Sequence, residues 1–168
     1  EVPRYPGSDV EALVRHVVTI HEWVEGIVSG LLEEPPVQVA ADGALSGPQL
    51  QDRFLLSLER LVASLAAADP DASVWTFGSD RTVSFWLRRR AHETAMHAGE
   101  AASAVGHRPP AIPLDLAVTG LGEGLRIHCQ RPLRKVEVGG TAQTVGITCN
   151  DADADWTITL HPVGIGVD

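Results

Sequence analysis

The sequence predicts a mainly α protein, α+β overall, with a helical bundle over residues 1–108 and a small, incomplete α/β region over residues 109–168. In three stretches of the first part, apolar residues recur every three or four positions, which is the spacing of one helix face. Segments rich in proline and glycine separate these stretches. In the second part, short alternating runs of apolar and polar residues indicate β-strands.

Capping and helix-breaking residues predict where the helices begin and end. Asp9 is suited to cap the first helix, and Pro35-Pro36 stops it. Pro48 belongs in the first turn of the second helix, where its missing N–H costs little. Gly106 ends the third helix. The three helices are therefore predicted over residues 10–34, 48–68 and about 82–105.

The third helix carries titratable side chains beside its apolar face. We expect the packing face to combine bulky residues with alanines that let neighbouring helices approach closely: Val83, Trp86, Leu87, Ala91, Ala95, Ala98, Ala102 and Val105. Glu93 and His97 lie along one edge of this face. Because burying an unpaired charge is costly, Glu93 must find a partner there.

Four positions separate Glu93 from His97, so the two side chains stack one turn apart and can hold one metal ion from the same side. His92 stands five positions before His97, so the segment lacks the His-Glu-x-x-His spacing of zinc proteases. The first helix offers His16, on or beside its buried stripe, and His21 as a rival ligand. The alternatives are a hydrogen-bonded core histidine and, for Glu93, an ion pair with a nearby arginine.

The C-terminal region is predicted to contain one helix and a β-hairpin. The helix extends over about 113–129, although three glycines weaken it, and β-type runs follow from Leu133. Two alternating segments, 144–149 and 156–161, flank a stretch of alternating aspartates and predict the hairpin. The aspartates resemble a calcium loop, but Trp156 stands where such a loop needs glycine, so we expect no calcium there.

Charge and hydropathy exclude several classes of partner. The 168 residues carry a net charge of -9 and one basic block, Arg88-Arg89-Arg90, so we expect no binding to nucleic acid or to an anionic membrane. No apolar run approaches the ~20 residues that span a bilayer and no signal peptide is evident, so a cytoplasmic location is expected. Cys129 and Cys149 are expected to be reduced thiols.

Two segments of the chain match family motifs. Residues 5–17, Tyr-Pro-Gly-Ser-Asp-Val-Glu-Ala-Leu-Val-Arg-His-Val, are similar to CPGWTVRDLVxHL, and His21-Glu22-Trp23 matches the His-x-Trp that follows it. Residues 85–97, Phe-Trp-Leu-Arg-Arg-Arg-Ala-His-Glu-Thr-Ala-Met-His, are similar to FWxRRxAHETxVH. With these motifs the chain resembles the mycothiol-dependent maleylpyruvate isomerase family. Ser8 and Ala12 depart from the first motif, which has tryptophan and aspartate there.

The resemblance implies both a fold and a metal site. The N-terminal domain of the family is a DinB-like up-and-down helical bundle that binds a divalent metal ion, usually zinc. The matching positions in this chain are His16, Glu93 and His97. Family members have a further helix before this point, and their C-terminal domain continues further. We therefore expect either a fragment of a larger protein or a homodimer or partner chain that supplies the missing helix.

The resemblance also implies a chemistry. Two imidazoles and one carboxylate leave one position of a tetrahedral zinc ion open, as in catalytic sites. We expect a metal-dependent transferase or isomerase in which a zinc-bound thiol, mycothiol, attacks an electrophilic small molecule. The alternative is a non-catalytic metal-binding or interaction module of the DinB-like superfamily, because proteins can keep a fold and lose its chemistry. The sequence does not decide between mycothiol and another thiol as the co-substrate, or between zinc, nickel and iron as the metal ion.

Overall fold

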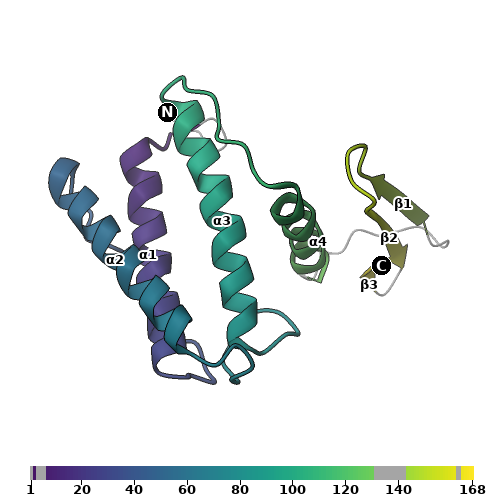
Figure 1. Ribbon diagram of the computed structural model, residues 1–168, viewed down its shortest axis with the longest axis horizontal. Coiled ribbons are helices and arrows are strands. Elements are labelled where there is room, and N and C mark those ends of the chain that lie inside the picture. Colours follow the sequence, from purple (N-terminus) through teal and green to yellow (C-terminus); the bar gives the residue numbers. More distant parts are fainter. Residues whose placement is uncertain (1, 3–6, 131–142, 162–163) are drawn as a thin grey trace. The chain divides into compact units, whose positions relative to one another are not determined.

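The computed structural model describes residues 2, 7–130, 143–161 and 164–168. Its elements within these ranges are α1 (Val10–Ser29), α2 (Gly47–Ala67), α3 (Val83–Ala104), α4 (Leu114–Gln130), β1 (Gln143–Thr148), β2 (Asp155–His161) and β3 (Gly164–Val167). They form two units, Glu1–Ala111 with the first three helices and Ile112–Asp168 with the fourth helix and the strands. The predicted class, a helical bundle with a small α/β part, is confirmed (Figure 1).

Local interactions explain where the helices begin and end. The carboxylate of Asp9 accepts a hydrogen bond from the N–H of Ala12 at 2.7 Å, which confirms that Asp9 caps α1. Pro48 lies in the first turn of α2, as predicted. Gly106 follows α3 with a φ of 75°, a left-handed conformation that glycine adopts without strain. α1 ends at Ser29, earlier than the prolines at 35 and 36 require.

The three helices of the first unit do not simply alternate in direction. α1 and α2 run the same way, since the N–H of Gly47 at the start of α2 donates to Glu11 in the first turn of α1 at 3.0 Å. The segment between them, residues 30–46, therefore returns along α1. α3 runs in the opposite direction (Figure 1). This antiparallel packing brings the middle of α3 close to the middle of α1.

An aromatic cluster forms part of the core of this unit. Trp86 is completely buried, and its Nε1 donates to the carbonyl of Trp75 at 2.8 Å. Trp23 of α1 meets the Trp86 ring edge-on at 5.7 Å between centroids, and Phe77 and Phe85 do so at 5.4 and 5.2 Å. Edge-to-face contacts of this kind stabilise a core beyond the area that they bury. The cluster ties α3 to α1 and to the segment before α3.

The inward face of α3 differs from the predicted packing face. Four residues of the predicted face are exposed: Leu87, Ala91, Ala98 and Val105. The inward row instead contains Arg90 and His97, which are 8% and 9% exposed, with Glu93 between them. The prediction was wrong for Ala91 and Ala98 because it treated each side chain singly. Charged side chains that pair with one another cost much less to bury than isolated ones.

The second unit consists of α4 and an antiparallel sheet with the strand order β1-β2-β3. β1 and β2 form the predicted hairpin, and β3 is a further strand that the sequence analysis did not identify. Trp156 of β2 is buried, and a Cβ on Gly122 of α4 would lie 3.0 Å from its indole nitrogen. The missing side chain at Gly122 therefore allows α4 to approach β2.

Two sequence predictions for this unit fall partly outside the described residues. The β-type runs predicted from Leu133 begin in the range 131–142, which lies outside them, as does the side chain of Cys129. Cys149 is a free thiol, as predicted.

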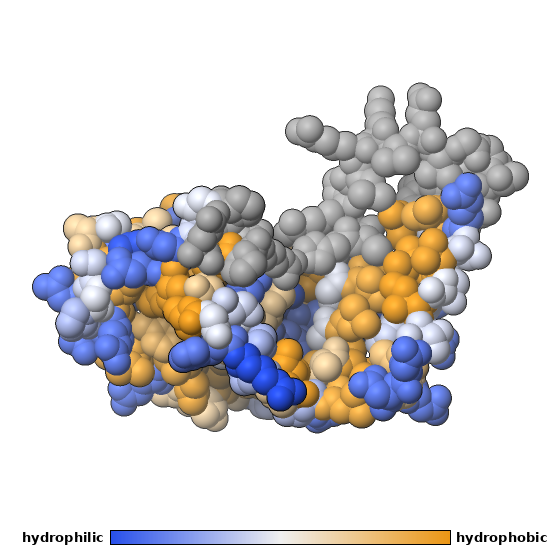
Figure 2. All heavy atoms as spheres, turned by 90° about the horizontal axis from the view of Figure 1, so that it is seen from above, coloured by the Kyte–Doolittle hydropathy of each residue, from blue (hydrophilic) through white to orange (hydrophobic). Residues whose placement is uncertain are grey.

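The described surface is mixed in polarity. Large hydrophobic side chains are exposed at several places on the first unit, for example Leu55 and Val62 on α2. On the face drawn in Figure 2, hydrophobic and hydrophilic residues lie interspersed. Among the described helices, none combines the length and the low polarity that crossing a bilayer requires.

Candidate metal centre

The antiparallel packing of α1 and α3 brings His16 and His97 together. Their ring centroids are 5.5 Å apart and their planes are inclined by 85°. Two imidazoles on one tetrahedral zinc ion have centroids about 5 Å apart, because each Zn–N bond is about 2.0–2.1 Å long. The spacing of the two rings therefore suits two ligands of one metal ion.

His21, the rival of His16, is the buried histidine of α1. It is 1% exposed, and its Nδ1 lies 3.2 Å from Oγ of Ser57 on α2. Ser57 donates its own proton to a carbonyl of the preceding turn at 2.9 Å, so His21 is the donor in their contact. Burial is the largest cause that lowers the pKa of His21 to about 4, and positive side chains of α3 lower it further. His21 is therefore a neutral core residue.

His16 is exposed, so it lies beside the buried stripe and not on it. The stripe of α1 instead contains Leu13, Val18, His21, Val24, Ile27 and Val28. A buried histidine needs a hydrogen-bond partner from another element, and Ser57 provides one for His21. Partial burial is the main cause that lowers the pKa of His16, and the neighbouring imidazole of His97 lowers it further, because two protonated rings would repel each other.

The imidazole of His97 is oriented by Glu100, one turn further along α3. Its Nδ1 lies 2.7 Å from the Glu100 carboxylate. An ionised carboxylate only accepts hydrogen bonds, so Nδ1 carries the proton and Nε2 of the neutral ring keeps its lone pair. Ligating histidines are commonly held by a carboxylate in this way. The sequence analysis missed Glu100, although its position three residues after His97 places it on the same side of the helix.

Glu93 is held by two arginines. One oxygen of its carboxylate pairs with Arg89 and the other with Arg90. The guanidinium of Arg89 also lies 5.6 Å from the Phe77 ring centroid, and that of Arg90 lies 5.9 Å from Trp86. The ion pair that the sequence offered as an alternative role for Glu93 is therefore present.

The structure thus brings together two of the three predicted ligands. Within the ranges that it describes, no group of three or more His, Cys, Asp or Glu side chains is arranged to hold a metal ion. His16 and His97 are suitably spaced for one ion, whereas the carboxylate of Glu93 is bound to the arginines. Two imidazoles and a carboxylate are nevertheless a donor set that suits zinc and similar divalent ions.

Comparison with known families gives a match over the first part of the chain. The family model described as the mycothiol maleylpyruvate isomerase N-terminal domain matches residues 1–102, which include His16, Glu93 and His97. The corresponding searches among curated proteins and among solved structures found no match.

Proposed function

The chain belongs to the mycothiol maleylpyruvate isomerase N-terminal domain family, and from this premise we propose that it is a metal-dependent transferase or isomerase. Its co-substrate would be mycothiol and its second substrate an electrophilic small molecule. His16, Glu93 and His97 would hold the divalent metal ion, zinc in the first instance. The observation that carries the proposal is the 5.5 Å spacing between the His16 and His97 rings, which come from separate helices. We also propose a cytoplasmic location, where a small thiol stays reduced.

Each side chain has its own task in this proposal. His97 would ligate through Nε2 while Glu100 holds the proton on Nδ1. His16 would supply the second imidazole from α1. Glu93 would turn from its arginines to become the third ligand, which leaves the guanidiniums of Arg89 and Arg90 beside the site. When bound, zinc lowers the pKa of a thiol that it coordinates, so that the thiolate forms at neutral pH.

Two reactions are open to such a thiol. In both, the thiol proton passes to water and the sulfur forms a bond to an electrophilic carbon. If a leaving group then departs with its bonding electrons, the result is transfer of the thiol. If the sulfur adds to a carbon–carbon double bond, that bond becomes a single bond about which the molecule can rotate, and expulsion of the thiolate re-forms the double bond in the isomer.

Zinc binding tests the site directly. We expect the purified chain to bind a single zinc ion in a calorimetric titration, and His16→Ala and His97→Ala to weaken binding by more than ~10-fold, since removing even an orienting partner costs that much. His107→Ala, which changes an exposed histidine after α3, is the matched control and should bind as the parent does. Unchanged affinity in both ligand variants would exclude this metal site.

The role of Glu93 differs between the enzymatic proposal, in which it binds the metal ion, and the alternative. The pairing of its carboxylate with Arg89 and Arg90 favours a non-catalytic binding or interaction module of the same superfamily. The discriminating assay is thiol transfer from mycothiol to a chromogenic aryl halide, with and without zinc. A rate that needs both zinc and mycothiol supports the enzyme. A folded, zinc-loaded chain with no rate above background supports the binding module.

A further inference from the structure

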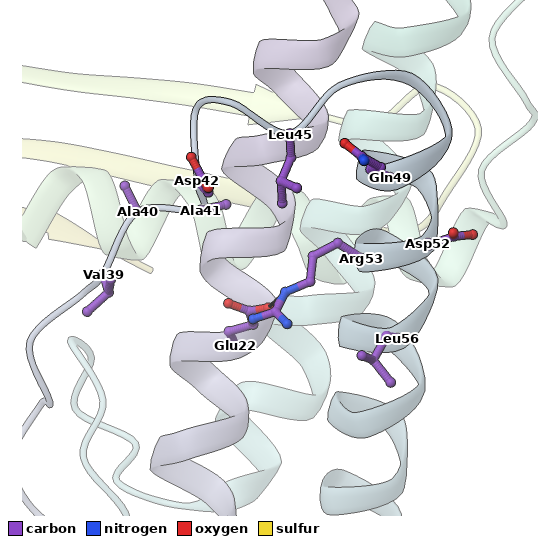
Figure 3. Close-up of a pocket in the computed structure, with 10 residues that line it drawn as sticks. All are labelled: Glu22, Val39, Ala40, Ala41, Asp42, Leu45, Gln49, Asp52, Arg53 and Leu56. Carbon is purple, nitrogen blue, oxygen red and sulfur yellow. Dashed lines mark ion pairs between the residues drawn. The ribbon is translucent and has the colours of Figure 1, made fainter.

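A cavity lies between α2, α1 and the segment that connects them (Figure 3). Its volume is about 510 Å³, within the range of about 300–1,000 Å³ that is typical of small-molecule pockets. Its apolar lining comes chiefly from Ala41, Leu45 and Leu56, and its polar lining includes Glu22, Asp42 and Arg53. None of these residues belongs to the proposed metal centre. The cavity is therefore a separate feature of the first unit.

The segment before α2 is held against α1 at three points, and the start of α2 at a fourth. The side chains of α1 that make these bonds are spaced four residues apart, and their partners follow in reverse order along the chain. Trp23 Nε1 donates to the Pro36 carbonyl at 2.8 Å, the Ala41 N–H donates to Thr19 Oγ1 at 2.9 Å, Arg15 Nε donates to the Leu45 carbonyl at 3.0 Å, and the N–H of Gly47, the first residue of α2, donates to Glu11 at 3.0 Å. Because this segment is held in place in advance, a ligand would not bear the cost of ordering it.

The charges of the lining favour a cation. Arg53 of α2 reaches across to Glu22 of α1, with 2.5 Å between Nε and Oε1, so these two charges largely neutralise each other (Figure 3). Asp42 and Asp52 then leave the lining with an excess of negative charge. In Figure 3 the Asp52 carboxylate is directed away from α1, whereas Asp42 lies on the segment that is held against α1. Asp42 is therefore the carboxylate best placed for a ligand.

We propose that this cavity binds a small organic cation, an amine with an apolar body. The apolar body would contact Leu45 and Leu56, and the ammonium would pair with Asp42 and compete with Arg53 for Glu22. An anion of the same shape would meet the excess of carboxylates in the lining. A neutral analogue would bury the same apolar surface without gaining an ion pair.

Three probes of one shape test the proposal. Benzylamine, benzyl alcohol and benzoate share a ring and differ in charge, and their binding to the full chain can be followed by two-dimensional amide NMR. We expect benzylamine to bind most tightly, in the weak range that so few atoms allow, and to shift amides within residues 39–45 and 49–56. These segments contain nine of the ten lining residues, with Glu22 as the tenth.

Asp42→Asn and a matched control isolate the role of the carboxylate. Oδ1 of Asp42 accepts from the Ala44 N–H at 2.9 Å, and Oδ1 of Asp69 accepts from the Asp71 N–H at 3.0 Å, two residues on in both cases. Asparagine keeps this acceptor and removes the charge. Asp42→Asn should weaken benzylamine binding by about 2- to 5-fold, the effect of one exposed ion pair, and leave benzyl alcohol binding unchanged. Asp69→Asn should change neither.

Several results would overturn the proposal. One is equal or tighter binding of benzyl alcohol or benzoate, and another is the same loss of benzylamine affinity in both asparagine variants. Amide shifts confined to other residues, or the lack of any shift with all three probes, would also overturn it. Because the probe comparison uses the unmodified chain, it decides the question even if Asp42→Asn fails to fold. Zinc binding takes no part in these measurements, so a failure here leaves the proposed function untouched.

Discussion

The stability of the first unit should fall in acid, because His21 must stay neutral when folded. His21 is 1% exposed, and burial is the main cause that lowers its pKa from 6.5 to about 4. Below pH 6.5 the unfolded chain therefore binds a proton that the folded chain does not. The contribution of His21 to the free energy of unfolding is fully present above that pH, decreases as the pH falls toward about 4, and is lost below it.

The size of this effect follows from the two pKa values of His21. The difference between 6.5 and about 4, at about 1.4 kcal/mol per pH unit, gives a total loss of about 3 kcal/mol. About 2 kcal/mol of this loss should be reached by about pH 5. Asp80, whose pKa is lowered chiefly by a hydrogen bond from Thr82, acts only below its ordinary value of 3.8. Its contribution therefore falls outside the range in which His21 acts.

Urea unfolding, followed by tryptophan fluorescence between about pH 7.5 and pH 4.5, measures this loss. His21→Gln cannot take up a proton there, so we expect it to be less stable than the parent at neutral pH and much less sensitive to acid. His107→Gln replaces an exposed histidine and should keep the acid sensitivity of the parent. If His21→Gln lost as much stability between the two pH values as the parent, burial of a neutral His21 could not be the cause.

Two further predictions concern local packing. Asp9→Ala removes the acceptor of the Ala12 N–H and should lower the free energy of unfolding, measured in urea, by about 1 kcal/mol. Asp9→Ser keeps an acceptor and should retain most of this stability. Equal losses in the two variants would mean that the cap contributes nothing. Gly122→Ala places a Cβ 3.0 Å from the Trp156 indole nitrogen and should speed hydrogen exchange of the β2 amides. Gly124→Ala is the control, because its Cβ would meet nothing within 4 Å, and it should stabilise α4 by up to about 1 kcal/mol. If hydrogen exchange of the β2 amides changed equally in both variants, the contact between position 122 and Trp156 could not be the cause.

The helices could be predicted from the sequence because the interactions that begin and end them are local. Asp9 caps α1 within one turn, Pro48 fits the first turn of α2, and Gly106 ends α3 through its own φ. The hairpin of β1 and β2 could likewise be predicted, because the alternation of apolar and polar residues and the turn between the strands belong to one short segment. Such features require no knowledge of distant residues.

The cavity could not be predicted in the same way. The sequence shows Glu11, Arg15, Thr19 and Trp23 at intervals of four, and this spacing places them in one row on α1. It does not show what the row binds, since the partners lie 13 to 36 residues further along the chain. The sequence analysis accordingly placed residues 35–47 only as a segment rich in proline and glycine between two predicted helices. A row of polar side chains opposite the buried stripe of a helix nevertheless indicates that a neighbouring segment of the chain can form hydrogen bonds to it.

The residues of the metal centre were grouped by resemblance rather than by periodicity. Periodicity placed His16 with the apolar residues of α1 and left His21 as its rival, and the structure reverses their environments. The difference depends on Ser57, a partner on another helix that no pattern within α1 could reveal. The pairing of Glu93 with arginines was foreseen, because Arg89 and Arg90 precede it by one turn.

The inward face of α3 connects the aromatic core with the candidate metal centre. Trp86 and Phe77 belong to the aromatic cluster, and each lies under the guanidinium of one of the two arginines that hold Glu93. The cluster thereby fixes the positions of the positive charges, and these fix the carboxylate. A polar row can face inward because its side chains are held by neighbours: Glu93 by two arginines, and His97 by Glu100. Metal binding at His16 and His97 would therefore act on an existing network, in which recruiting Glu93 means breaking an ion pair that the core supports.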